Sequence, residues 1–322
     1  MKLFLGSART ALKIILSEIK FDSNEILLLP NFICDVVLHP INDLKIKYLY
    51  YNIKENLEPD WDNLFLLISN DKNIKAILIV HYFGNPFFLD KYLEISESCN
   101  IEMIEDNAHG YGGYYGGKEI GTFGKWGISS PRKILNLPSG GILYSSTEVS
   151  SFFKLTHFGI FNLKEISKIV LFIFPYLYRI IKPFISKYIQ HGNEGLTMSR
   201  VERDRKIDII SKFIIDRTDW SSVQRKRSEN WDLWTDFALK NGLRLVYEEL
   251  HAGSSPWMLP VYAKNLHDRN NWLNWGIKYK INFTSWPNLP VDVLLEGEVA
   301  YTIWERLICI PLDTKPPKYY IK

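Results

Sequence analysis

The first two thirds of the chain alternate between two hydrophobic patterns. Apolar side chains recur at helical spacing in residues 8–20 and 89–98, which predicts helices that bury one face. Short apolar runs ended by turn residues predict buried strands at 25–29, 45–51, 74–82, 101–104, 126–130 and 142–145. Strands separated by helices favour a mostly parallel sheet with helices on both faces.

The pattern changes after residue 146. The chain becomes mostly helical as far as the tryptophan-rich segment 220–234, and short strand patterns then follow at 243–247, 258–262 and 307–311, around a helix at 267–277. We therefore predict a large α/β domain over residues 1–200 and a smaller α+β domain over residues 201–322.

Composition excludes several classes of protein. Hydrophobic residues make up 46% of the 322 residues and charged residues 23%, as in a globular protein. A net charge of +3 is too small to indicate a nucleic-acid binder. The three cysteines lie far apart, so we expect no metal site and no disulfide framework. No secretory signal pattern is present, and we expect a cytoplasmic protein.

Residues 166–185 are rich in apolar and aromatic side chains. Three charges and two prolines interrupt them, which argues against a membrane-spanning helix. We interpret the segment as helices buried against the domain or a partner subunit. The alternative is an interfacial helix that rests on a membrane surface.

The segment GSARTAL, residues 6–12, places small residues before a helix. The first N–H groups of a helix are unpaired and attract anions, phosphates above all. Ser7 and Thr10 would add hydroxyls to such a site. The alternative is that Ser7 only caps the helix.

Asp106 and His109 follow the apolar strand 101–104. A carboxylate at the end of a buried strand needs a partner, and a protonated heterocyclic nitrogen is one candidate. His109 could reach the same ligand. The alternative is an acid that caps a turn beside a surface histidine. The glycine-rich segment 109–117 is not followed by a helix, so we predict a loop and hairpin and not a dinucleotide site.

Lys133 lies between the predicted strand 126–130 and the glycine pair 140–141. Ser129 and Ser130 just before it could hold a phosphate. A sheltered lysine beside another cation, here Arg132, loses its proton more readily and can form a Schiff base. The alternative is an exposed pair of cations on a loop.

Five segments, taken in order, resemble the DegT/DnrJ/EryC1/StrS family of sugar aminotransferases. They are GSARTAL, LPNFICDVV, AILIVHYFGNP, IEMIEDNAHGYGGYYGGKEIGTFG and SSPRK with its following GG. The resemblance is clear over residues 5–146 and weaker beyond. It implies the type I fold of pyridoxal 5'-phosphate (PLP) enzymes, with an α/β domain followed by a smaller α+β domain.

The resemblance also implies roles for the polar residues. Lys133 looks like the lysine that bonds to PLP and moves the proton at the substrate carbon. Asp106 matches the acid that pairs with the pyridine nitrogen, and His109 matches a residue near the phenolic oxygen. The expected cofactor contacts further include Ser7, Arg9, Thr10, Ser129 and Ser130 around the phosphate, and Cys34, where many members place an aromatic ring over the cofactor. Asn193 is a candidate for contact with the phosphate of a neighbouring subunit.

We therefore expect a homodimeric PLP-dependent aminotransferase. It would move an amino group from an amino acid to a nucleotide-linked keto sugar, and glutamate is the expected donor. The product would serve the biosynthesis of surface polysaccharide or of secondary-metabolite sugars. The segment SSPRK is about one residue shorter than the usual SFxxxK, and the family's arm before GSART is not seen in this sequence. A family member that binds a ligand or partner without catalysis is therefore the alternative. Dehydration of the sugar is disfavoured, because family dehydratases replace the lysine by histidine.

Overall fold

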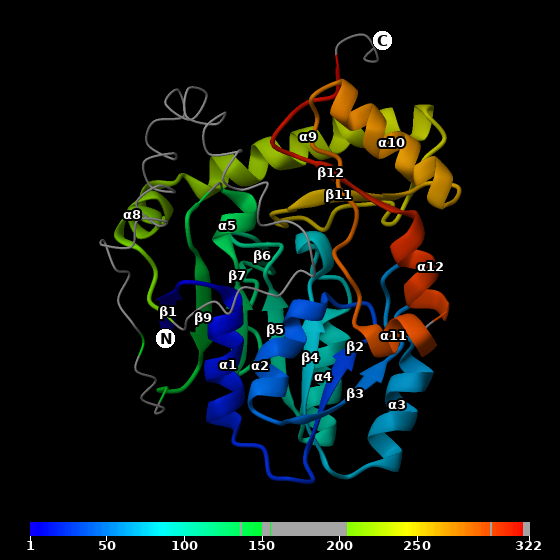
Figure 1. Ribbon diagram of the computed structural model, residues 1–322. Helices are drawn as coiled ribbons and strands as arrows, with labels where there is room; N and C mark the ends of the chain where they lie inside the picture. Colours follow the sequence, from blue (N-terminus) through cyan, green and yellow to red (C-terminus); the bar gives the residue numbers. More distant parts are fainter. Residues whose placement is uncertain (136, 150–154, 156–204, 297, 318–322) are drawn as a thin grey trace, which may run out of the picture.

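A seven-stranded sheet lies at the centre of the computed structural model, which describes residues 1–135, 137–149, 155, 205–296 and 298–317 (Figure 1). Its strands follow the order β1–β9–β8–β5–β4–β2–β3. Neighbouring strands pair in parallel except at β9, which is antiparallel to both β1 and β8. The predicted, mostly parallel sheet is confirmed. The strands are β1 (Lys2–Leu5), β2 (Ile26–Pro30), β3 (Lys47–Tyr51), β4 (Ile74–Val80), β5 (Glu102–Asn107), β8 (Trp126–Ser129) and β9 (Gly141–Ser145).

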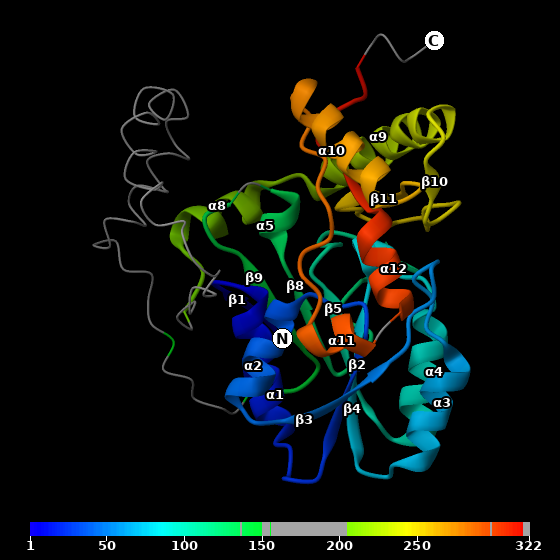
Figure 2. The ribbon, with the colours of Figure 1, turned by 45° about the vertical axis from the view of Figure 1, so that its right-hand side comes forward.

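Helices cover both faces of this sheet, as Figure 2 shows. On one face, α1 (Ala8–Ile19) and α2 (Leu38–Asp43) pack on Leu27 and Leu29 of β2. On the other face, α3 (Trp61–Asn70) and α4 (Leu89–Cys99) pack in the core that contains Ile26 and Leu28. Alternate residues of one strand thus enter two different cores, which is why the strand is apolar throughout.

Strand β5 runs further than the apolar pattern predicted. It includes Glu105, Asp106 and Asn107, whereas the sequence pattern ended the strand at residue 104. The following loop supplies hydrogen-bond partners for these side chains, although Oδ1 of Asn107 has none among the described residues. Asn107 donates to the carbonyls of Gly110 and Ile120 at 3.2 and 2.9 Å. That loop holds the short hairpin of β6 (Tyr114–Tyr115) and β7 (Lys118–Glu119), as predicted.

Short helical turns link the sheet to its surroundings. Between β2 and α2 lies the 3₁₀ helix η1 (Asp35–Val37), and after β4 comes η2 (Tyr82–Gly84). Between β8 and β9 lies α5 (Pro131–Ile134), which begins with a proline, a residue suited to the first turn of a helix.

The three strands predicted in the C-terminal part are present, and they pair as a three-stranded antiparallel sheet. One buried side chain, Trp234, anchors it by donating from its indole N–H to the carbonyl of Thr314 at 2.8 Å. This region shares one core with the α3–α4 face of the large sheet. The elements are β10 (Arg244–Leu245), β11 (Met258–Tyr262), β12 (Leu307–Pro311), α8 (Ile209–Arg217), α9 (Trp220–Lys240), α10 (Leu266–Lys278), α11 (Val291–Glu296) and α12 (Glu298–Arg306).

Three expectations fall outside the described residues: the aromatic segment 166–185, Asn193, and the domain boundary at 200/201. Among the residues that the structure describes, no helix has the length and apolar character needed to cross a membrane.

Candidate active site

A pocket lies at the edge of the sheet where the parallel strands end. Its walls come from the start of α1, from the 32–37 segment, from the ends of β4, β5 and β8, and from Trp257 and residues 286–287 of the C-terminal part. The pocket encloses about 810 Å³, a volume that includes space open to solvent. This is the position at which open α/β sheets bind their ligands.

Lys133 enters the pocket from α5. Its backbone N–H donates to the carbonyl of Ser130 at 3.0 Å, and its Nζ lies 4.6 Å from the ring centroid of Trp257. Burial lowers the pKa of this amine, and the nearby Arg132 adds to that effect, while Asp106 opposes it. Arg132 lines the mouth of the pocket with an exposed side chain. The amine therefore loses its proton more easily than an ordinary lysine.

Asp106 faces the same pocket from the end of β5 and is buried. Its Oδ1 accepts a hydrogen bond from the N–H of Ala108 at 2.9 Å. Burial raises the pKa of the carboxyl, whereas that N–H, Lys133 and His81 hold it down. A buried carboxylate that opens onto a pocket is suited to pair with a protonated group of a ligand.

His109 lines the same pocket as Lys133 and Asp106. Its Nδ1 accepts a hydrogen bond from the backbone N–H of Phe83 at 3.2 Å, so the neutral ring carries its proton on Nε2. Burial and Lys133 lower the pKa of this imidazole well below its usual range. The ring also packs against Trp257, with centroids 4.7 Å apart. His109 is thus a neutral donor through Nε2.

The start of α1 forms the other end of the pocket. Ser7 caps this helix by accepting from the N–H of Thr10 at 3.2 Å, and the two hydroxyls lie 3.2 Å apart. Ser7, Ala8 and Arg9 line the pocket, whereas the side chain of Thr10 is turned to Ser7. Ser7 therefore caps the helix, as one alternative for this segment expected, and the helix start still lines the pocket, where it can attract an anion.

The glycine pair after Lys133 packs directly on this helix start. Gly140 donates its N–H to the carbonyl of Gly6 at 3.0 Å. A Cβ at Gly141 would lie only 2.0 Å from the carbonyl carbon of Ser7. Only glycine permits this approach, which brings the GSART turn to the lysine segment.

The two serines before Lys133 differ in position. Ser130 lines the pocket, and its hydroxyl donates to the carbonyl of Gly140 at 3.3 Å. Ser129 is fully buried on β8, with its hydroxyl beside that of Tyr144 and outside the pocket lining. Side chains of consecutive residues in an extended segment point to opposite sides. The hydroxyl of Ser130 can therefore meet a ligand in the pocket, whereas that of Ser129 cannot.

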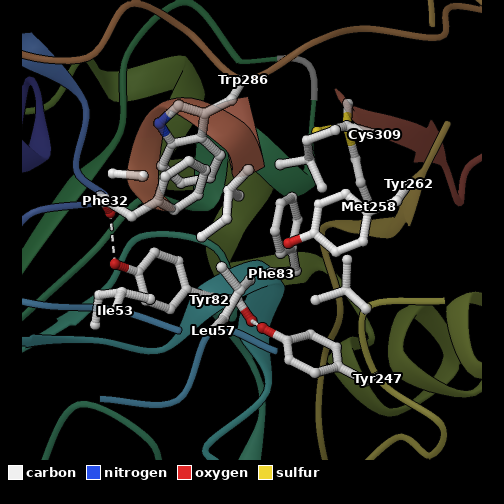
Figure 3. Packing of buried hydrophobic residues seen from close by; sticks show 14 of the residues in the cluster. Phe32, Ile53, Leu57, Tyr82, Phe83, Tyr247, Met258, Tyr262, Trp286 and Cys309 are labelled. Atoms are coloured by element: carbon white, nitrogen blue, oxygen red, sulfur yellow. Dashed lines mark hydrogen bonds between the residues drawn. The ribbon is translucent and has the colours of Figure 1, made fainter. Parts of the chain in front are cut away.

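Cys34 lines the pocket at the position where the resemblance leads us to expect an aromatic ring. Burial raises the pKa of its thiol to about 11, so the thiol is neutral. Aromatic rings nearby come from Phe32 and Trp286, whose centroids lie 4.6 Å apart (Figure 3). Neither Trp286 nor Trp257 was predicted as a site residue. Both tryptophans lie beyond residue 146, where the resemblance to the family is weaker, so no motif singled them out.

Glu105 supports the pocket from behind. It is fully buried, and its carboxylate accepts from His81 Nε2 at 3.1 Å and from the backbone N–H groups of Gly121, Phe123 and Gly124 at 3.0, 2.5 and 2.7 Å. These bonds tie the glycine-rich loop to β5 and fix the strand that presents Asp106.

This donor set fits PLP. The N–H groups at the start of α1, with Ser130 and Arg9, suit a phosphate. The buried carboxylate of Asp106 suits a protonated pyridine nitrogen, the Nε2–H of His109 suits a phenolic oxygen, and the amine of Lys133 suits an aldehyde. Among the described residues, no cluster of metal-ligating side chains is found.

Comparison with solved structures shows the fold. A structure of Spr1654 from Streptococcus pneumoniae in its PLP form, named as a sugar aminotransferase, superposes on this chain with a TM-score of 0.70. The two sequences are 17% identical, and the superposition covers 99% of this chain and 84% of Spr1654. This confirms the type I aminotransferase fold.

Comparison with curated sequences finds shorter matches. EpsN of Bacillus subtilis, named as a pyridoxal phosphate-dependent aminotransferase, is 35% identical over 78 residues, which are 24% of this chain and 20% of EpsN. GDP-perosamine synthase of Escherichia coli O157:H7 is 44% identical over 50 residues, 16% of this chain and 14% of that enzyme. The matches thus span less than a quarter of these relatives' own lengths.

The family comparison covers more of the chain. The model of the DegT/DnrJ/EryC1/StrS aminotransferase family matches residues 3–165, half of the sequence, and this range includes Lys133, Asp106 and His109. The chain belongs to the DegT/DnrJ/EryC1/StrS aminotransferase family, as the order of its motifs predicted.

Proposed function

We propose that this protein is a PLP-dependent aminotransferase that moves an amino group from glutamate to a nucleotide-linked keto sugar. The observation that carries the proposal is the convergence of Lys133, Asp106 and His109 on one pocket that also contains the start of α1. Family membership and the name of GDP-perosamine synthase support a sugar nucleotide as acceptor. The proposal includes a cytoplasmic homodimer that serves polysaccharide or secondary-metabolite sugar synthesis.

When bound, PLP supplies an electron sink for the carbon that loses a proton. Asp106 would accept a hydrogen bond from the pyridine nitrogen and keep that nitrogen protonated. His109 would donate from Nε2 to the phenolic oxygen, since its Nδ1 is occupied by the N–H of Phe83. The two side chains would orient the ring from two of its edges.

The start of α1 would hold the phosphate end. The N–H groups of Ala8 and Arg9 are among the first of the helix, and both residues line the pocket. Ser130 lies on the same wall and can turn its hydroxyl from the carbonyl of Gly140 to an incoming phosphate. Backbone donors at a helix start bind such an anion without a large change in conformation.

Lys133 would perform the proton transfer. Its Nζ would hold the cofactor at rest. Once free, the amine would take a proton from the donor's carbon and pass it to the cofactor, and in the second half of the reaction it would carry a proton from the cofactor to the sugar carbon that receives the amino group. A general acid–base works best when its pKa lies near the working pH. The lowered pKa of Lys133 moves the amine in that direction.

The alternative is a family member that binds a ligand or partner without catalysis. The shorter SSPRK segment motivated this alternative, because a lysine shifted by one residue could miss the site. In the structure, α5 nevertheless directs Lys133 into the pocket with Asp106 and His109. This arrangement favours the catalytic proposal.

The proposal is tested by adding PLP to the purified protein and treating it with borohydride. We expect a yellow protein, loss of the colour on reduction, and a PLP mass on the peptide that contains Lys133. The Lys133→Ala variant should show no such mass. A panel of nucleotide keto sugars with glutamate as donor then identifies the acceptor. Wild-type protein that PLP does not colour would refute the proposal, and gel filtration tests the dimer.

A further inference from the structure

Trp257, from the C-terminal part of the chain, packs against the amine of Lys133. The ammonium nitrogen lies 4.6 Å from the centre of the indole ring, within the range of a cation–π interaction. Trp257 precedes β11 and reaches across from the small sheet to the pocket of the large sheet. The contact joins two segments 124 positions apart (257 − 133).

The backbone of Trp257 is held from two sides. Its N–H donates to the carbonyl of Phe83 at 3.0 Å, and its own carbonyl accepts from the guanidinium of Arg227. Arg227 is buried on α9 and also donates from Nε to the carbonyl of Pro256 at 2.7 Å. Helix α9 therefore fixes this residue over the pocket.

The ring of Trp257 is held as well. It lies nearly parallel to the ring of Phe83, at an interplanar angle of 11° with centroids 6.4 Å apart, and it packs on His109 at 4.7 Å. Aromatic neighbours and two backbone bonds leave the indole few alternative orientations. The face offered to Lys133 is thus preformed.

Few other groups stabilise the charged amine. Of the groups that act on Lys133, Asp106 favours the ammonium form, and Arg132 and burial oppose it. Cys34 and Cys309 also face it, but burial raises the pKa of their thiols to about 11 and about 12, so both are neutral. His109 is neutral too. An indole face is therefore a substantial part of what holds the ammonium in place.

We propose that Trp257 is a positioning residue that holds the protonated amine of Lys133 at the pocket whenever the amine is not bonded to the cofactor. This inference rests on the proposed function, because transamination alternates between a bonded and a free lysine. Between proton transfers the free amine would otherwise adopt many rotamers. The indole would keep Nζ in the pocket that Asp106 also lines, within reach of the reacting carbon.

The first test needs no cofactor. Acetylation of Lys133 by acetic anhydride is measured by mass spectrometry across pH in the full-length, cofactor-free protein. Trp257→Leu should lower the pH midpoint by about 0.4 to 1 unit, because it removes the cation–π contact. Trp257→Phe should keep part of the effect. Trp272→Leu, a tryptophan outside the pocket, is the matched control and should leave the midpoint unchanged.

The test uses the pH midpoint of acetylation. The absolute rate is unsuitable, because removing the indole also opens the pocket to the reagent. An unchanged midpoint in a folded Trp257→Leu protein would overturn the inference. The second test compares steady-state kinetics, where Trp257→Leu should lower kcat about tenfold with little change in KM. A wild-type protein that binds no PLP refutes the proposed function, and the acetylation result still decides whether Trp257 holds Lys133.

Discussion

The backbone N–H of Phe83 donates to Nδ1 of His109 at 3.2 Å, across the ends of β4 and β5. Phe83 has a φ of 56°, a left-handed conformation that costs a residue with a side chain about 1–2 kcal/mol. Such strain persists where surrounding contacts enforce it. Here it turns the N–H toward the buried imidazole and leaves Nε2 as the proton-bearing nitrogen that can serve a ligand.

This buried histidine should make the cofactor-free protein sensitive to acid. The folded protein holds the pKa of His109 well below its usual range, so at low pH the unfolded chain binds a proton that the folded chain does not. Stability should therefore fall as pH drops below about 6.5, by up to about 1.4 kcal/mol per pH unit. The His109→Gln variant should lack this pH-dependent loss of stability. The free energy of unfolding in urea, measured at pH 7.5 and at pH 5.5, tests this.

The exposed His267 provides the control, since His267→Gln should keep the wild-type dependence. If His109→Gln loses as much stability between the two pH values as the wild type, the imidazole is not held neutral.

Adjacent serines should differ in their effect on cofactor affinity. Ser130→Ala removes a hydroxyl from the pocket wall and should raise the Kd for PLP about tenfold, as expected for one hydrogen bond to a charged phosphate. Ser129→Ala should leave the Kd within about twofold, because Ser129 lies outside the pocket lining. Fluorescence titration with PLP measures both. A larger effect from Ser129 would reverse the assignment.

A methyl group at Gly141 should disrupt the helix start of the pocket. Its Cβ would lie 2.0 Å from a backbone carbon of Ser7, so Gly141→Ala should destabilise the protein by about 3 kcal/mol or more and weaken PLP binding. Gly242→Ala is the control. Gly242 has a φ of +74° and no neighbour within 4 Å, so its change should cost about 1 kcal/mol and leave binding intact. Equal losses in urea unfolding would contradict the close approach.

The carboxylate of Glu105 should matter for stability more than for chemistry. Glu105→Gln places an amide N–H₂ among four donors and leaves some unpaired, so we expect a loss of about 3 kcal/mol. Glu102→Gln alters a partly exposed carboxylate on the same strand and should cost less than about 1 kcal/mol. Thermal unfolding compares the two, and hydrogen exchange at Gly121 and Gly124 should rise only in the first variant.

Local patterns predicted most of the large sheet. Strands and helices of the first 146 residues agree with the structure within a few residues, because side-chain periodicity depends on neighbours along the chain. The hydrophobic pattern predicted that β5 ends before Glu105, because a buried carboxylate is not expected in a strand. It also passed over β1, a short edge strand, and the helices α2, α3 and α5.

The sequence by itself determined the family and most of the strands of the large sheet, and it singled out Lys133, Asp106 and His109, because these stand in short contiguous motifs. Only the tertiary structure decided that Ser130 and not Ser129 faces the pocket, that Glu105 anchors the glycine-rich loop, and that Trp257 covers Lys133. Those facts depend on contacts between distant segments, and their geometry is set by how the two sheets pack. No periodicity within one segment encodes that packing.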